Sequence, residues 1–492
     1  MQREPLINLF EHEINNKLSK YTGEIRATIT EEGISPSLLS EIISLHTIKA
    51  LKMIDKHKRY RTDESALPIF KRQMPDSNKI DNKLVNDFFS EIVDTKTGYM
   101  FGNPVVMQVD KSMVEDASTY DLLATKIQEL KVRSNLDDTN SENCKMAAIC
   151  GYDAMLAYID KEGEEAVQRI DPWEAIILSE REYTEPEFAI RTYTTWDDKR
   201  IAELYDSEYI YIYESPTTSS TSFVFRERVA HMFAYCPMWG VPNNAELQGD
   251  ADKVLTLIDA YDRTMSDFNS EIEQFRLAYL LFYGVEPDAE TIDALKQTGA
   301  LYIPPSESGE SANDVKYLVK NLDHAALDSH LDRLEDNIMR FAKHVNFTDE
   351  SFGSSISGVA MRFKIFHLET KAKYFERKHN AALMYMFKVI GSAWKAKGIN
   401  FEWTTLENKY TRNLPVNLVD EAQAATALMG LVSQRTAISQ LSFVNDVDRE
   451  MEEIEREKGD TVNLDDVDLT ENEEDRNEEG EKRTDQDENG DE

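Results

Sequence analysis

The glycine spacing most suggestive of chemistry in this chain lies at Gly353 and Gly358, which frame three serines and an isoleucine. Loops that cradle the phosphates of a nucleotide share this spacing, but their second glycine is followed by Lys and then by Ser or Thr. Here Val359 and Ala360 take those places, and no strand is predicted before the loop. We therefore interpret the glycines and serines as the composition of a mobile polar loop, not of a nucleotide site.

Other patterns that could support catalysis or metal binding are also incomplete. His324 and His330 are six residues apart, which is the wrong spacing for one helix face, and no His-Glu-x-x-His occurs. The pair Asp465-Asp466 falls in an acidic tail that cannot hold a geometry. Three cysteines without metal-ligand spacing indicate free cytosolic thiols: Cys144, Cys150 and Cys236. The sequence thus predicts no catalytic residue, no metal and no cofactor.

Composition restricts the class of protein further. The 492 residues include 55 Lys plus Arg against 92 Asp plus Glu, a formal net charge of −37. Tight nucleic-acid binding depends on Lys and Arg side chains that neutralise the phosphates, so a chain this acidic is expected to bind nucleic acid weakly at most. The densest apolar run, Leu277 to Tyr283, is far too short to cross a bilayer, and the N-terminus lacks an apolar signal core. We expect a soluble protein made in a cytoplasm.

The polar loop is positioned by two long predicted helices. Asp323 to Val345 contains no Gly or Pro, and Val359 to Ile390 continues a helical pattern for many turns. Both exceed the three turns that are typical of globular domains. A loop mounted on two such rods, Thr348 to Gly358, indicates a segment projected into a channel or into the groove of a partner.

A long predicted helix and a small unit inserted after it resemble a stalk with a head. Asp250 to Tyr283 is predicted as a helix of roughly 50 Å at about 1.5 Å per residue. Gly284 to Asn321 follows as a small inserted unit with a short helix (288–297) and two strands (300–303 and 315–319). The stalk has little core of its own, so we expect it to pack against copies of itself.

The remaining segments predict a mixed domain and a tail. Helices are expected at Ser40–Arg59, Asn82–Tyr99 and Tyr120–Ile159. Strands are expected at 105–109, 167–170, 175–178, 188–193, 209–213 and 401–406, giving an antiparallel sheet. Two further helices, Asn417–Leu431 and Gln434–Arg456, precede a tail expected to be disordered. From residue 446 to the end, 6 basic and 23 acidic residues give 6 − 23 = −17.

Four phrases of the chain resemble those of a known family. The first comprises 82–89 (Asn-Lys-Leu-Val-Asn-Asp-Phe-Phe) and 98–105 (Gly-Tyr-Met-Phe-Gly-Asn-Pro-Val). The second is 353–371, which contains Ser-Gly-Val-Ala-Met-Arg-Phe-Lys, and the third is 375–378 (Phe-Glu-Arg-Lys). The fourth is 433–458. In this order the chain resembles the portal proteins of tailed double-stranded DNA phages, of the type found in phages of Gram-positive bacteria. The likeness covers nearly the whole chain, and its phrases are more specific together than singly.

The resemblance implies an α+β, mainly helical portal fold. Its subunits form a ring, commonly of about twelve, around a central channel. By analogy the segments are a wing (1–249), a stem helix (250–283), a clip (284–321), a second stem helix (322–345), a tunnel loop (346–358), a long helix with a wing return strand (359–413), a crown (414–460) and an acidic tail (461–492).

The resemblance also implies sites and partners. The DNA-facing tunnel loop would comprise Thr348, Asp349, Glu350, Ser351, Phe352, Gly353, Ser354, Ser355, Ile356, Ser357 and Gly358. The clip surface that docks the terminase large subunit and later a head-completion or adaptor protein would comprise Pro304, Pro305, Ser306, Glu307, Ser308 and Gly309. The wing would contact major capsid and scaffolding proteins. The ring would be assembled in the host bacterial cytoplasm and occupy the portal vertex of the virion, without membrane contact.

Electrostatics suggests how DNA would pass such a ring without sticking. The predicted stem helix carries Asp252, Asp259, Asp262, Asp267, Glu271 and Glu273. Carboxylates repel a duplex that bears about one negative charge per 1.7 Å, but only within about 8 Å at physiological salt. The acidic stem helices are therefore expected to line the channel with carboxylates that repel DNA at short range. The serines of the tunnel loop are expected to make transient contacts with DNA phosphates.

Two other classes of function remain open at this point. One is a non-catalytic acidic adaptor or scaffold that oligomerises and recruits a basic partner through its tail. The other is a nuclease that uses acidic residues and a metal, which incubation with Mg²⁺ and DNA would reveal by cleavage.

Overall fold

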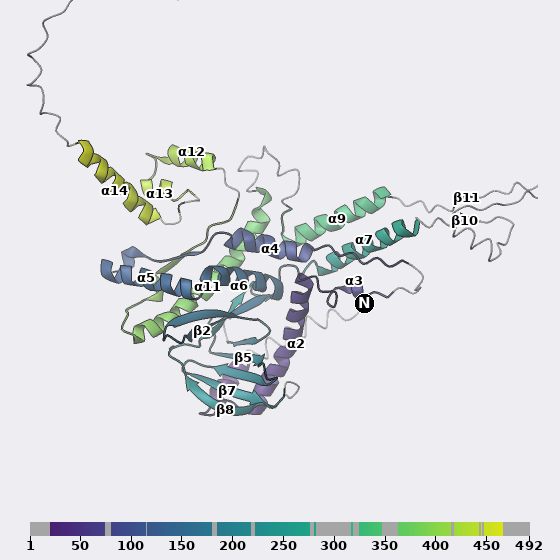
Figure 1. Ribbon diagram of the computed structural model, residues 1–492, viewed down its shortest axis with the longest axis horizontal. Coiled ribbons are helices and arrows are strands. Elements are labelled where there is room, and N and C mark those ends of the chain that lie inside the picture. The colour runs from purple at the N-terminus through teal and green to yellow at the C-terminus, as the bar shows by residue number, and fades with distance from the viewer. Residues whose placement is uncertain are drawn as a thin grey trace, which may run out of the picture. The chain divides into compact units, whose positions relative to one another are not determined.

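The computed structural model divides the chain into two units, Met1–Asn413 and Leu414–Glu492 (Figure 1). It describes residues 20–73, 80–114, 116–179, 185–217, 222–275, 280–281, 316–317, 324–346, 363–414, 418–441, 444 and 447–465. Helices and antiparallel strands are mixed within the first unit, as predicted. No helix among these residues combines the length and apolarity that a membrane crossing requires.

The larger sheet of the first unit has its strands in the order β4-β5-β6-β7-β8, all antiparallel. They are β4 Ala175–Leu178, β5 Phe188–Thr194, β6 Arg200–Tyr205, β7 Tyr209–Ser215 and β8 Val224–Ala230. Three of the predicted strands are confirmed here, and β6 and β8 add to them. Along β7 buried side chains alternate with partly buried ones, because successive residues of a strand face opposite sides of the sheet.

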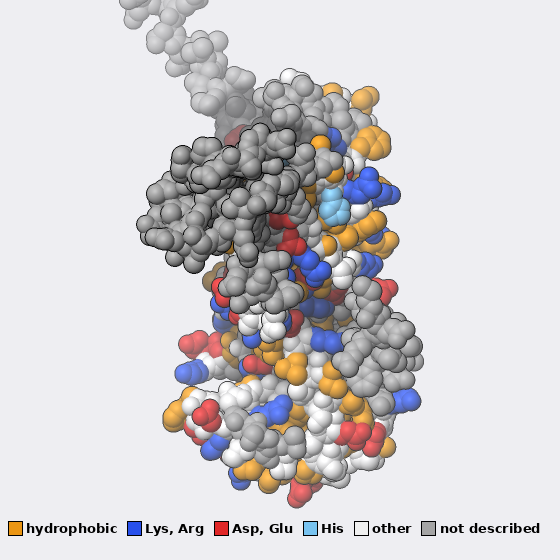
Figure 2. All heavy atoms as spheres, turned by 90° about the vertical axis from the view of Figure 1, so that its right-hand side faces the viewer, with side chains coloured by type: hydrophobic (Ala, Val, Ile, Leu, Met, Phe, Trp, Pro, Cys, Tyr) orange, Lys and Arg blue, Asp and Glu red, His pale blue; other side chains and the backbone are white. Residues whose placement is uncertain are grey.

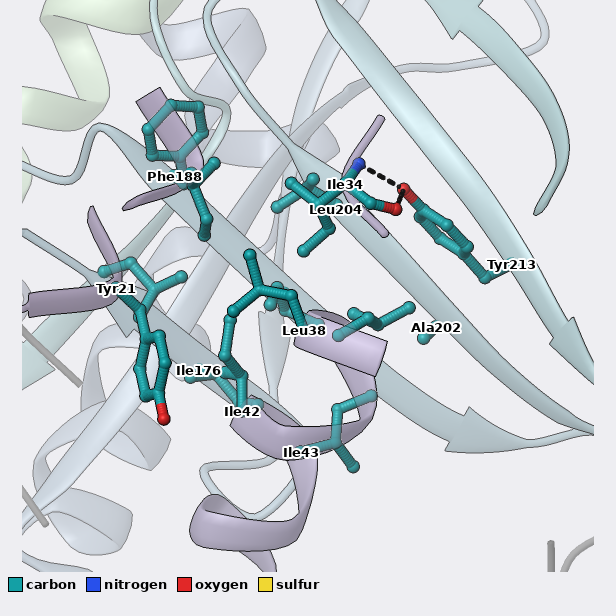
Figure 3. Packing of buried hydrophobic residues seen from close by; sticks show 14 of the residues in the cluster. Tyr21, Ile34, Leu38, Ile42, Ile43, Ile176, Phe188, Ala202, Leu204 and Tyr213 are labelled. Carbon is teal, nitrogen blue, oxygen red and sulfur yellow. Dashed lines mark hydrogen bonds between the residues drawn. The ribbon is translucent and has the colours of Figure 1, made fainter. Parts of the chain in front are cut away.

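The helix α2 (Pro36–Tyr60) packs on this sheet and confirms the predicted helix at Ser40–Arg59. Its start is set by Ser35, whose side chain accepts the Leu38 N–H, and by proline in the first turn. Figure 3 shows its apolar residues facing those of the strands, and Tyr213 reaching the backbone of Ile34. The Tyr213 hydroxyl accepts the Ile34 N–H at 2.8 Å and donates to the Ile34 carbonyl at 3.1 Å.

The predicted helix Tyr120–Ile159 is wrong in its last part. Helices α5 (Ala117–Arg133) and α6 (Leu136–Cys150) are followed by the strand β2 (Tyr152–Ile159). Gly151 ends α6 with φ +99°, and a Cβ there would meet the Leu247 carbonyl oxygen at 2.0 Å. The strand β2 is central in a three-stranded sheet, between β3 (Glu165–Ile170) and β9 (Met238–Pro242). Its first six residues are all buried, so the two-residue period that marks a strand is absent.

The long helix α11 (Phe366–Ala396) confirms the long predicted helix, although the described helix starts later and ends later than Ile390. Its inner face packs on β9 and β2 through residues such as Tyr385, whose hydroxyl donates to the Cys236 carbonyl at 3.0 Å. The chain then returns as β12 (Leu406–Lys409), which pairs with β1 (Val106–Val109). The predicted return strand at 401–406 is therefore displaced toward the C-terminus, behind the short 3-10 helix η3 (Trp403–Thr405).

The paired helices α7 (Leu255–Phe275) and α9 (His324–Ala342) lie side by side (Figure 1). They are antiparallel, because Ile258 and Ile338 share one core while Phe268 contacts His324 edge to face with ring centroids 5.8 Å apart. The prediction of one helix from Asp250 to Tyr283 is wrong at both ends. Residues 250–254 form turns, and β10 (Leu280–Leu281) pairs with β11 (Lys316–Tyr317). The other predicted elements of 284–321 lie outside the described residues.

The second unit contains α12 (Leu418–Leu428), α13 (Gln434–Ile438) and α14 (Val447–Asp465). The first of these confirms the helix predicted at Asn417–Leu431. The single helix predicted at Gln434–Arg456 is wrong, because the chain leaves the helix at Ser439 and resumes one at Val447. The prediction of a disordered tail from residue 461 is wrong for its first residues, because α14 continues to Asp465. Ser433 caps α13 by accepting the Thr436 N–H.

Candidate functional site at the base of the paired helices

An extended segment, residues 80–87, lies along α7 and replaces the first part of the helix predicted at Asn82–Tyr99. The helix α4 begins only at Phe88 and runs to Phe101, with Asp87 as its cap. Backbone N–H groups of alternate residues donate to side chains of α7: Asn82 to Ser270 at 2.9 Å, Leu84 to Ser266 at 2.9 Å, and Asn86 to Asp262 at 2.8 Å. We call residues 80–87 the strap.

The periodicity of the strap explains why it is extended. Two extended residues advance about 6.6 Å and four helical residues about 6.0 Å, so every second N–H meets every fourth side chain of α7. Asn86 also donates its side-chain amide to Asp262 at 3.0 Å, and Asn82 donates its amide to Glu273 at 2.8 Å. A helix beginning at Asn82 would turn the Asn86 N–H to a carbonyl of its own backbone. It would also rotate the Asn82 and Leu84 N–H groups out of line with Ser270 and Ser266, so the bonds to α7 would be lost.

Replacing Ser266 with alanine tests the strap. Ser266 is fully buried, and its loss leaves the Leu84 N–H without its acceptor. We expect the free energy of unfolding to fall by about 1–3 kcal/mol, the usual effect of a buried donor left unsatisfied. Urea unfolding followed by circular dichroism measures this change. Thr264→Ala is the matched control, because the Thr264 hydroxyl bonds the Ala260 carbonyl of its own helix. An equal loss in both variants would contradict the role of the strap.

Cations from the N-terminal part of the chain pair with the acids of this helix and of the turn before it. Lys56 lies 2.7 Å from Asp252 and Arg59 2.5 Å from Asp259. Arg72 lies 2.5 Å from Asp267 and also contacts Asp81. Asp262 is almost fully buried under the strap, and burial raises its pKa despite the bonds from Asn86. Within one chain, three of these acids are thus paired with cations and Asp262 is covered by the strap, while the Asp267 side chain is still 53% exposed.

A buried charge cluster lies where the paired helices meet the body of the unit. Asp250 forms ion pairs with two ammonium groups, those of Lys96 on α4 and Lys371 on α11, and each nitrogen lies 3.2 Å from the same carboxylate oxygen. Asn243 donates its amide to the other oxygen of Asp250 at 2.8 Å and accepts from Lys96 at 2.5 Å. The Lys96 nitrogen also lies 4.5 Å above the ring of Phe375.

The cluster holds more positive than negative charge in a site largely closed to water, where the most exposed of its three charged side chains, Lys371, is 12% exposed. Asp250 and Lys96 side chains are 4% and 1% exposed. Burial alone would raise the pKa of Asp250, but Lys371 and Lys96 outweigh it and hold this pKa below its ordinary value. Burial lowers the pKa of Lys371. Removal of the single carboxylate would leave two buried ammonium groups without a counter-charge.

The same cluster connects both described flanks of the predicted tunnel loop. Lys371 donates to the carbonyl oxygen of Ala342, the last residue of α9, at 3.0 Å. Val345 before residues 347–362 and Ile365 after them are buried. One group of side chains therefore joins the start of the α7 segment, the end of α9 and the first turns of α11.

A second clamp fixes α11 to α4 and to the returning chain. Arg412 lies 2.8 Å from Glu369 and 2.5 Å from Glu376, both on α11. The hydroxyl of Tyr99, on α4, donates to Glu369 at 2.6 Å, and the Asn413 N–H donates to the Tyr99 carbonyl at 2.9 Å. The first half of α11 is thus fixed to α4 and to the returning chain by these contacts.

The family of the chain follows from a comparison with known proteins. A family model described as phage portal protein, SPP1 Gp6-like, matches residues 43–463, which is most of the chain. The chain belongs to this portal protein family. The match includes the strap, both paired helices, α11 and the three residues of the buried charge cluster.

Two curated portal proteins are similar to this portal chain over most of their lengths. The portal protein of Clostridium phage phiCD119 is 24% identical over 390 residues, which cover 75% of this chain and 83% of that protein. The portal protein of Bacillus phage SPP1 is 25% identical over 477 residues, which cover 89% of this chain and 90% of that protein.

The site residues expected from the resemblance lie outside the described part of this portal chain. This holds for all of Thr348–Gly358 and for all of Pro304–Gly309, so both sets remain predictions. The structure instead describes the residues that carry the loop: α9, α11, the strap and the buried charge cluster. Sequence reasoning missed Lys96, Asp250 and Lys371. A signal for Lys96 was present, because it follows Phe89, Ile92 and Val93 on the apolar stripe of α4.

The described residues of the portal chain hold no metal-binding cluster, and their thiols are buried. No group of three or more His, Cys, Asp or Glu side chains there could hold a metal ion. All three cysteines are buried free thiols, and burial raises the pKa of Cys144 to about 11 and that of Cys236 to about 12. Thiols with such pKa values are poor nucleophiles at neutral pH.

Proposed function

We propose that this protein forms the ring at one capsid vertex through which double-stranded DNA is packaged, retained and ejected. The observation that carries the proposal is the family match across residues 43–463. The antiparallel α7 and α9, with the strand pair β10 and β11 beyond them, support it as a stem that leads to a clip. A conduit of this kind needs no catalytic group, and the proposed role is structural, with ATP hydrolysis left to the terminase.

The segments are assigned as follows in this proposal. Residues 1–249 with 359–413 form the wing and its long helix, 250–283 and 322–345 the stem, 284–321 the clip, 346–358 the tunnel loop, 414–460 the crown and 461–492 an acidic tail. Residues 304–309 of the clip dock the terminase and later a head-completion or adaptor protein. The wing contacts major capsid and scaffolding proteins, and the ring contains about twelve copies.

Weak contact with DNA is part of the proposal. Without residues 446–492 the formal charge is −37 − (−17) = −20, so the rest of the chain is still acidic. A protein surface of this sign offers few phosphate contacts, and its repulsion acts only at short range. Because Asp259 and Asp267 of α7 are paired with cations and Asp262 is covered by the strap, the polar tunnel loop at 348–358 is the segment proposed to touch DNA.

Electron microscopy of the purified protein tests the ring. We expect closed rings with rotational symmetry and a pore that runs through the particle and is wide enough for a duplex. Filter binding with linear DNA at about 0.15 M salt, where charges are screened beyond about 8 Å, is expected to show weak retention. Particles without a through-going pore, or monomers under every assembly condition, would refute the proposal.

Adding charge to the proposed tunnel loop tests the DNA contact. Replacing Ser354 and Ser355 with lysine adds two phosphate-binding cations per subunit at the narrowest point, and we expect packaging to slow or stall. The measurement is DNA content per head after a fixed packaging time. Ser354→Thr with Ser355→Thr is the matched control, because it keeps the hydroxyls and adds no charge. Normal DNA content in the lysine variant would show that these residues do not face the duplex.

A further inference from the structure

An aromatic and basic surface lies where the end of α9 meets the first turns of α11. Four aromatic side chains there are exposed: Phe341 by 52%, Phe363 by 76%, Phe366 by 61% and Tyr374 by 56%. The bond from Lys371 to the Ala342 carbonyl joins the two helices, and the Lys343 nitrogen lies 6.0 Å from the centre of the Tyr374 ring. Figure 2 shows hydrophobic and basic side chains next to one another at the upper right of the face that it draws.

The α11 part of this surface is one stripe of the helix. Lys373, Tyr374 and Arg377 follow Phe366 by seven, eight and eleven residues, which places all four on one side of the helix. Lys373 pairs with Glu369 at 3.5 Å, whereas Arg377 has no ion pair within the described residues. Aromatic residues and arginine are the types enriched at protein interfaces. We call Phe341, Phe363, Phe366, Lys373, Tyr374 and Arg377 the aromatic–basic surface.

A second surface on α9 has the opposite charge. Asp328, Asp332 and Asp336 are exposed and are spaced by four residues, which places them on one side of the helix. None of the three has an ion pair in the described part of the chain. Burial raises the pKa of neighbouring Glu335, and Glu91, Asp332 and Asp336 raise it further, so these acids repel one another in a single protomer. We call Asp328, Asp332 and Asp336 the acidic flank.

The two surfaces point away from each other on α9. Asp332 and Phe341 are nine residues apart, about two and a half helical turns, so they lie on opposite sides of the helix. The aromatic–basic surface and the acidic flank have complementary charges but face opposite directions, so they cannot contact each other within one protomer. Between copies, such head-to-tail contacts build rings when the rotation closes.

We propose that the aromatic–basic surface of one copy docks on the acidic flank of the next, with Arg377 facing Asp332 and Asp336. The inference rests on the proposed ring and adds which surfaces close it. The apolar side chains supply the area removed from water, and the paired charges determine the order of the copies.

Charge reversal in the full-length chain tests the contact. Arg377→Glu alone and Asp332→Arg alone each place like charges opposite one another. We expect either variant to reduce the ring fraction about tenfold or more at equal protein concentration, measured by sedimentation velocity. Lys161→Glu is the control: it reverses an exposed cation in the turn between β2 and β3 and is expected to leave the ring fraction unchanged.

Mixing the two variants provides the decisive measurement. In an alternating ring, the glutamate introduced at position 377 of one copy meets the arginine introduced at position 332 of the next, and the other contacts stay native. Equimolar mixing is therefore expected to restore rings that neither variant forms alone. Circular dichroism and melting temperature of the monomers check that both variants fold.

Each remaining outcome overturns the proposal in a distinguishable way. Rings in both single variants show that the surface assignment is wrong while the portal role stands. If Asp332→Arg forms normal rings that retain DNA, the acidic flank faces the channel and not a neighbour. If Tyr374→Ser lowers the melting temperature of the monomer but not the ring fraction, residues 347–362 of the same chain cover the surface. An absence of rings in the wild-type protein instead refutes the proposed function itself.

Discussion

Replacing Asp250 with asparagine is expected to reduce the free energy of unfolding of the first unit by about 3–5 kcal/mol. Asparagine keeps the shape of the side chain and its bond to Asn243 but removes the only carboxylate between Lys96 and Lys371. Two ammonium groups would then remain buried without a counter-charge. Breaking a buried pair by removing one partner is far more damaging than losing an exposed pair, which contributes about 0–1 kcal/mol.

Urea unfolding followed by tryptophan fluorescence measures this effect. Two further variants test whether it arises from the buried charges. Asp267→Asn is the matched control, because Asp267 also pairs with a cation but its side chain is 53% exposed. Adding Lys371→Met to Asp250→Asn removes one of the two stranded charges and is expected to restore part of the lost stability. If Asp250→Asn costs no more than Asp267→Asn, then water enters the site and the cluster is not closed.

The cluster also matters for the proposed portal role. Its three charged residues belong to α4, to the turn before α7 and to α11, and Lys371 also holds the end of α9. The described chain on the two sides of residues 347–362 is therefore joined through the same cluster. Under the proposed function, Asp250→Asn would loosen the support of the tunnel loop without altering any residue of the loop.

Elements with a strong local pattern were predictable from the sequence. The apolar stripe of α2, the long Gly- and Pro-free segment that forms α9, and the alternating β7 each carry their period in their own residues. The family was predictable as well, because its phrases are spread along the chain in order. In these cases local propensity and tertiary structure agree, as a foldable sequence requires.

Elements decided by distant partners were not predictable. Leu84, Val85 and Phe88 have helical spacing, yet residues 80–87 are extended because their N–H groups bond side chains of α7 that lie nearly two hundred residues away. The strand β2 lacks a two-residue period because its first six residues are all buried, and the helices α6 and α11 both contact it. Lys371 follows the same logic, because it resembles a surface residue until Asp250 is placed beside it. Lys96 differs, since it already lies on the apolar stripe of α4.

Lowering the pH from about 7.5 to about 5.5 is expected to destabilise the first unit through two buried histidines. His46 on α2 and His379 on α11 are each at most 2% exposed. Burial lowers the pKa of His46 to about 3, with a smaller contribution from Lys49, and burial lowers the pKa of His379 to about 3. Each ring bonds a neutral partner, the Trp173 carbonyl at 3.2 Å and the Tyr410 hydroxyl at 2.8 Å.

The direction of the effect follows from which state binds the proton. Between the folded pKa near 3 and the ordinary value of 6.5, the unfolded chain is protonated at these rings and the folded chain is not. Their contribution to stability is therefore complete above 6.5 and is lost progressively as the pH falls toward 3. At about pH 5.5, one unit below the ordinary value, each ring accounts for about 1.4 kcal/mol, so the pair accounts for about 3 kcal/mol.

Other groups also titrate over this range, and the comparison of variants separates them. Burial lowers the pKa of His57 and His231 as well, which adds to the acid effect, whereas the raised pKa of buried Asp153 opposes it. His46→Gln and His379→Gln remove one titration each and leave those groups in place. In urea melts at both pH values, each variant is expected to lose about 1.4 kcal/mol less than the wild type on acidification. If the variant and the wild type lose the same free energy of unfolding on acidification, the imidazole has the same pKa in the folded and unfolded chains. In that case the ring is not shielded from solvent.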